Sequence, residues 1–116
     1  MGTLTTHVLD TARGRPGAGI CVELYAFGEE RRFLTSQSTD QDGRCPKPLL
    51  EGAAMQPGIY ELVFHAGEYF RELSVELPEP PFLDRVVIRF GIASPDQHYH
   101  VPLLLSPYGY ATYRGS

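Results

Sequence analysis

Short runs of alternating hydrophobic and polar residues dominate this chain. In the run covering residues 20–27, alternate positions are apolar: Ile20, Val22, Leu24 and Ala26. Similar runs occupy five other stretches: residues 3–9, 59–65, 85–90, 98–105 and 108–113. Alternation with a period of two is the pattern of a β-strand with one face on a core. The pattern therefore predicts an all-β sandwich or barrel built mainly from antiparallel strands.

Glycine and proline separate these runs, with 12 Gly and 10 Pro among 116 residues. The pair Asp42-Gly43 tolerates a positive φ and predicts a tight turn. One stretch departs from the strand pattern, because residues 68–73 favour a short helix that ends before Pro78. The sequence contains no internal repeat and no composition shift, so we expect a single domain over residues 1–116.

Composition narrows the possible functions. Hydrophobic residues make up 42% of the chain and the net charge is -4, a globular balance without the basic excess of a nucleic-acid-binding protein. No apolar run is long enough to cross a membrane, and the first residues do not resemble a secretory leader, so we expect a cytoplasmic protein. Cys21 and Cys45 could form one disulfide, but two buried free thiols are favoured in that compartment.

Two histidines interrupt strands on the face that avoids the core. His7 lies opposite Leu4 and Val8, and His100 interrupts the apolar run 98–105 in the same way. If these faces meet at an interface, two imidazoles become enclosed together and can move protons near neutral pH. His98 and His100 are two residues apart, which is also a spacing for metal ligands on a strand. No third ligand is placed by the sequence, so we expect no metal.

Four segments carry a resemblance to a known family. They are LTTHVLD with the following GRP (residues 4–16), DGR (42–44), HYHVPLLLSPY (98–108) and the ending YRGS (113–116). Together they resemble the transthyretin-related proteins from residue 4 to residue 116. The ending is similar to the tetrapeptide of the branch of this family that hydrolyses 5-hydroxyisourate.

The resemblance implies a fold, an assembly and a site. The fold would be a prealbumin-like antiparallel β-sandwich of two four-stranded sheets with one short helix. The assembly would be a homotetramer, a dimer of dimers, with active sites in the channel between dimers and no cofactor, nucleic acid or membrane as partner. The matching catalytic positions are His7, Arg44, His100 and Ser116. The matching substrate-binding positions are His7, Arg44 and Tyr113.

The implied reaction is the opening of 5-hydroxyisourate, a small oxidised purine, by attack of water at a ring carbonyl during urate degradation. One imidazole would serve as the base, and Arg44 would anchor the substrate or the developing oxyanion. Ser116 would offer both a hydroxyl and the terminal carboxylate. The sequence leaves open which histidine is the base, and which face of the last strand meets the channel. A small-ligand carrier of the same fold and a β-sandwich interaction module remain alternatives.

Overall fold

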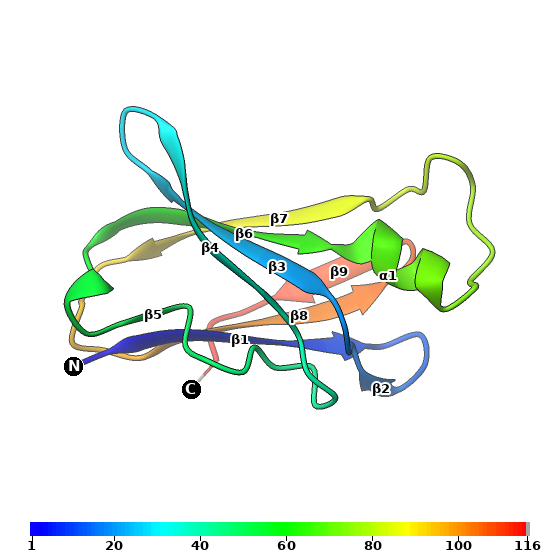
Figure 1. The fold of residues 1–116 in the computed structure, drawn as a ribbon, viewed down its shortest axis with the longest axis horizontal. Coiled ribbons are helices and arrows are strands. Elements are labelled where there is room, and N and C mark those ends of the chain that lie inside the picture. The colour runs from blue at the N-terminus through cyan, green and yellow to red at the C-terminus, as the bar shows by residue number, and fades with distance from the viewer. Residues whose placement is uncertain (116) are drawn as a thin grey trace.

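A computed structural model describes residues 1–115, which form two packed β-sheets and one short α-helix (Figure 1). The sheet elements are β1 (Thr3–Asp10), β2 (Arg15–Pro16), β3 (Cys21–Phe27), β4 (Arg31–Ser38), β5 (Leu50–Glu51), β6 (Gly58–His65), β7 (Arg85–Ile92), β8 (Tyr99–Ser106) and β9 (Gly109–Thr112). The helices are α1 (Ala66–Glu72) and a single 3-10 turn, η1 (Gly52–Ala54). The predicted all-β sandwich with a short helix is confirmed.

The sheet that contains β1 differs from the expected one in two respects. It has five strands, in the order β2-β1-β8-β9 with β5 also pairing to β1, whereas the other sheet has four strands in the order β4-β3-β6-β7. In addition, β1 and β8 run parallel, while the other pairs are antiparallel. The pair of β1 and β8 is therefore the exception in a sandwich that is otherwise antiparallel, as expected. Parallel pairing is possible here because the chain crosses to the second sheet and back between the two strands.

The core lies between the two sheets and is filled by the apolar positions of the alternating runs. Leu4 and Val8 of β1 are fully buried, as are Leu62 and Phe64 of β6. Alternation on β8 likewise directs Leu103 and other apolar residues inward. The remaining positions of β1 and β8 are consequently left on the opposite face of the five-stranded sheet, where they are available for chemistry.

On β6 the polar side of the pattern is buried as well. The sequence places Glu61 and Val63 opposite the core face, yet both are less than a tenth exposed. β6 lies between β3 and β7, so neighbouring side chains cover this outer face. Arg31 Nε donates to Oε1 of Glu61 at 3.2 Å, and Arg89 Nε donates to Oε2 at 3.0 Å. Paired in this way, a buried carboxylate is tolerated.

The helix α1 starts two residues earlier than predicted and packs against the end of β1. Tyr69 donates its hydroxyl hydrogen to Asp10 Oδ2 at 2.7 Å, and both residues are buried. Burial and the Asp10 carboxylate raise the pKa of Tyr69 to about 12, so this phenol stays protonated. No helix within residues 1–115 is long and apolar enough to span a membrane.

The two cysteines are free and half-buried, in agreement with the favoured reading of two thiols. Burial raises the pKa of Cys45 to about 11 and also raises that of Cys21. Both therefore remain protonated thiols near neutral pH, which makes them unreactive as nucleophiles.

Candidate functional site

Two strands that are far apart in the sequence bring their outward-facing histidines together. In the parallel pair of β1 and β8, Thr5 lies opposite His100 and His7 lies two residues further along the same face. His7 Nδ1 is 2.6 Å from His100 Nε2, with ring centroids 4.8 Å apart and ring planes inclined by 16°. The sequence anticipated such a meeting at an interface between chains. The structure brings the two imidazoles together on one sheet of a single chain.

The second nitrogen of His100 is also engaged. Its Nδ1 lies 2.8 Å from the Thr5 hydroxyl oxygen, which projects from β1 beside it. Thr5, His100 and His7 therefore form a continuous hydrogen-bonded row across the sheet. Sequence reasoning missed Thr5, although its position two residues before His7 on the same strand face was a usable signal.

Arg44 is placed by a turn that is fastened to β1. Gly43 has a φ of 76° and its carbonyl accepts the backbone N–H of Val8 at 2.8 Å. A Cβ at this position would lie 2.4 Å from the Val8 carbonyl oxygen, so only glycine permits the approach. Asp40 Oδ1 accepts the backbone N–H of Arg44 at 3.1 Å and tightens the same turn. The backbone of Arg44 thereby forms an isolated antiparallel β-bridge with the backbone of His7.

The surroundings favour neutral imidazoles. Partial burial is the main cause that lowers the pKa of His7, and the Arg44 cation lowers it further. Burial also lowers the pKa of His100, followed by the neighbouring His7 and Arg44. Because the two rings share one hydrogen between facing nitrogens, protonation of both would bring two N–H groups into conflict. The pair is thus available as a base near neutral pH.

The two histidines line an open pocket of about 510 Å³ on this face of the sheet. Its other lining residues are Thr3, Thr5, Arg44, His98, Tyr113 and Gly115. The sequence did not decide which face of the last segment meets the site. Tyr113 and Gly115 line the pocket, so it is the face that carries these two residues. The pocket combines an arginine, hydroxyls and imidazoles, a set of groups that suits a small polar ligand.

The last described residues are held against β8. Gly115 N–H donates to the His100 carbonyl at 2.7 Å, and Arg114 Nη2 donates to the His98 carbonyl at 3.1 Å. The Arg114 guanidinium also lies over the Tyr99 ring, 4.1 Å from its centroid. A Cβ on Gly115 would lie 2.7 Å from His100 Cδ2, so the glycine fits directly under the imidazole. Ser116, the remaining residue expected in the site, lies outside the described residues.

His98 lines the same pocket but has different partners. Its Nδ1 lies 3.0 Å from the Thr3 hydroxyl, at an exposed position just before β8. Within residues 1–115, no three His, Cys, Asp or Glu side chains are grouped so that they could hold a metal ion. In the part of the chain that the structure describes, His98 and His100 therefore have no third metal-ligating side chain of these types beside them.

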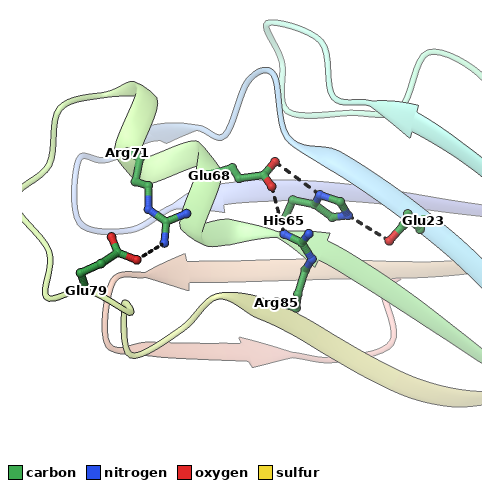
Figure 2. A network of polar contacts seen from close by, with 6 residues as sticks. All are labelled: Glu23, His65, Glu68, Arg71, Glu79 and Arg85. Atoms are coloured by element: carbon green, nitrogen blue, oxygen red, sulfur yellow. Dashed lines mark hydrogen bonds and ion pairs between the residues drawn. The ribbon is translucent and has the colours of Figure 1, made fainter.

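The fourth histidine belongs to a separate network at the start of α1 (Figure 2). His65 Nε2 lies 2.9 Å from Glu23 Oε1, and its Nδ1 lies 3.5 Å from Glu68 Oε2. Arg85 pairs with Glu68 at 3.3 Å. The hydrogen bond from His65 is the main cause that lowers the pKa of Glu23, and Arg85 is the main cause for Glu68. This imidazole is enclosed by carboxylates and has no part in the pocket.

The sequence model of the HIUase/Transthyretin family matches residues 4–115. The chain belongs to this family. A 5-hydroxyisourate hydrolase of Pseudomonas aeruginosa is 60% identical over 117 residues, covering 100% of this chain and 93% of that protein. The structure of 5-hydroxyisourate hydrolase of Klebsiella pneumoniae superposes with a TM-score of 0.83 at 34% identity and covers 100% of both chains.

A transthyretin shares the fold at lower identity. Sea bream transthyretin, solved in complex with thyroxine, superposes with a TM-score of 0.86 at 23% identity, covering 97% of this chain and 94% of that one. This likeness concerns the fold alone. Because one fold can carry several functions, the function has to be argued from the residues of a site rather than from the fold.

Proposed function

We propose that this protein hydrolyses 5-hydroxyisourate to 2-oxo-4-hydroxy-4-carboxy-5-ureidoimidazoline in urate degradation. The observation that carries the proposal is the contact of His7 with His100 at 2.6 Å in a pocket that also contains Arg44. Two relatives named 5-hydroxyisourate hydrolase, each 60% identical over almost the whole of this chain, support the choice of substrate. A neutral imidazole pair beside a guanidinium provides both a base and an anion-binding group.

The reaction requires a base because water is a weak nucleophile. An imidazole of the pair takes a proton from water as its oxygen bonds to the ring carbonyl carbon. Negative charge then develops on the carbonyl oxygen, where the Arg44 guanidinium can donate two parallel hydrogen bonds. Collapse of this intermediate breaks the carbon–nitrogen bond, and the imidazolium returns the proton to the leaving nitrogen.

Two further residues belong to this proposal. Tyr113 lines the pocket and would contact the bound substrate. Ser116 would contribute its side-chain hydroxyl. Ser116 is assigned from the family pattern alone. No cofactor is required by this mechanism.

The proposed assembly is a homotetramer, a dimer of dimers, in which the pocket faces another copy. The pocket is open to solvent in a single chain, and a second copy over it would shield the reacting groups from bulk solvent. We place the enzyme in the cytoplasm. Light scattering should give about four times the mass of one chain.

The direct test is the decay of 5-hydroxyisourate absorbance after addition of the protein, with urate oxidase generating the unstable substrate in place. We expect decay well above the spontaneous rate. Binding of the substrate without accelerated decay would instead indicate a carrier, and neither binding nor decay would indicate an interaction module.

A further inference from the structure

The row formed by Thr5, His100 and His7 constrains where its hydrogens lie. Two neutral imidazoles carry two ring hydrogens on four nitrogens, and one hydrogen must lie between His7 Nδ1 and His100 Nε2. The second hydrogen is then either on His100 Nδ1, facing Thr5, or on the outer nitrogen of His7, Nε2. Only the first arrangement leaves His7 Nε2 with a lone pair that can accept a proton from water.

The groups around His100 Nδ1 favour the first arrangement. The Thr5 hydroxyl oxygen lies 2.8 Å away and can accept a hydrogen bond there. Thr5 also lies directly opposite His100 in the parallel register, which holds its hydroxyl beside the ring. Because Thr5 lines the pocket, its own hydroxyl hydrogen can bond to solvent.

We propose that Thr5 is a positioning residue that holds the hydrogen of His100 on Nδ1. With that nitrogen donating to Thr5, His100 Nε2 must accept, and His7 must donate from its Nδ1. His7 Nε2 is then the basic nitrogen of the site. Thr5 thereby assigns the base role to His7 without contacting the substrate's reacting atoms. The catalytic consequence rests on the proposed hydrolysis, whereas the hydrogen arrangement is independent of it.

The hydrogen arrangement can be measured directly by ¹⁵N NMR of histidine-labelled protein at about pH 8, where imidazoles are neutral. We expect both His7 and His100 to be Nδ1–H tautomers, the less common form of free histidine. Thr5→Val removes the hydroxyl at nearly constant volume and should shift His100 and His7 toward Nε2–H. Thr5→Ser keeps the hydroxyl and should restore the wild-type spectrum.

A matched control is provided by the next residue of β1. Thr6 points into the core and donates its hydroxyl hydrogen to the Val101 carbonyl at 2.6 Å. Thr6→Val should lower stability through loss of a buried hydrogen bond, yet leave both tautomers unchanged. A change of tautomer in Thr6→Val as large as in Thr5→Val would overturn the proposal, because the effect would then be general loosening of β1.

Kinetics supply the second readout. Loss of one neutral hydrogen bond predicts that Thr5→Val lowers kcat roughly three- to tenfold with little change in KM, and that Thr5→Ser recovers the rate. An Nε2–H tautomer for His7 in the wild type, or an unchanged spectrum in Thr5→Val, would contradict the assignment. If the tautomers are as expected but the wild type does not hydrolyse 5-hydroxyisourate, the proposed function fails while the role of Thr5 in the row stands.

Discussion

The molecule contains two histidine sites with opposite surroundings. On the five-stranded sheet, His7 faces His100 with Arg44 nearby, and burial, with the Arg44 cation as a further cause, lowers the pKa values of both rings. At the start of α1, His65 lies between two carboxylates, Glu23 and Glu68 (Figure 2). The same side chain therefore lies beside another imidazole and a cation in one site, and beside two carboxylates in the other.

This difference separates a site suited to chemistry from one suited to structure. A neutral imidazole with a free lone pair can accept a proton, whereas an imidazole between carboxylates donates hydrogen bonds and connects strands to a helix. The first site also opens onto a pocket of about 510 Å³. The sign of the neighbouring charges therefore distinguishes the two histidine sites.

The largest expected effect comes from removing an imidazole of the pair. His7→Asn and His100→Asn should each lower kcat by at least about 10²-fold, the scale of a lost proton-transfer group. Both side chains lie off the core, so both variants should still fold. His65→Asn should lower the thermal midpoint but leave kcat within about twofold, since the effects of distant sites are independent. Steady-state kinetics and thermal melts on the three variants test this, and wild-type turnover in His7→Asn would exclude His7 from the mechanism.

The next effect should come from Arg44. Arg44→Gln removes the cation and should reduce kcat roughly 10²-fold, as for the loss of one oxyanion-binding donor. The same change should raise the pKa values of His7 and His100, because Arg44 lowers both. The acid limb of the pH–rate profile should therefore move to higher pH. Arg85→Gln in the His65 network is the matched control and should leave the profile in place.

A smaller effect is expected at the segment that lies against β8. Gly115→Ala would put a Cβ 2.7 Å from His100 Cδ2 and should displace the ring, with roughly a tenfold loss of kcat. Gly109→Ala adds a methyl group 3.7 Å from its nearest neighbour, Ser106 Oγ, and should be tolerated. Steady-state kinetics that compare kcat of Gly115→Ala with kcat of Gly109→Ala test this prediction. Equal activity in both would mean that the close approach to His100 is unimportant.

The smallest effect concerns stability as a function of pH. Because the folded pKa values of His7 and His100 lie below the reference of 6.5, the unfolded chain binds more protons as pH falls below that value, and stability decreases. Glu23 has a pKa below its reference of 4.5, so the stability it contributes is lost at still lower pH. Urea unfolding should show both windows. His100→Asn should weaken the loss of stability just below pH 6.5, and His65→Asn should weaken the loss at lower pH that comes from Glu23. The opposite pattern would contradict the comparison of the two histidine sites.

Much of the fold could be predicted because its strands alternate cleanly, and β1, β3 and β7 follow the pattern. The strand β4 was missed, since its residues from Arg31 to Ser38 are largely exposed and have no apolar face. The parallel pairing of β1 with β8 could not be read from periodicity, because pairing between distant segments depends on the crossover of the chain between sheets. Strand parity did place His7 and His100 off the core.

The site itself was only partly predictable. Parity gives the face of a residue but not its neighbour, so the hydrogen bond from His100 to Thr5 required the register of β1 against β8. The role of Gly115 likewise depends on a distance of a Cβ to a ring, which no sequence pattern records. Arg44 was found through the family resemblance, and the structure supplies the physical reason, a glycine turn bonded to β1.

The pH dependence of kcat/KM tests most directly whether the imidazole pair of His7 and His100 provides the base. This profile reports the ionisation of essential groups in the free enzyme. For the wild type we predict an acid limb with its midpoint below 6.5, the reference pKa from which both rings of the pair are lowered. The same limb should persist in His65→Asn. A midpoint at or above 6.5, or a limb that disappears when His65 is replaced, would contradict the assignment of His7 and His100 as the catalytic pair.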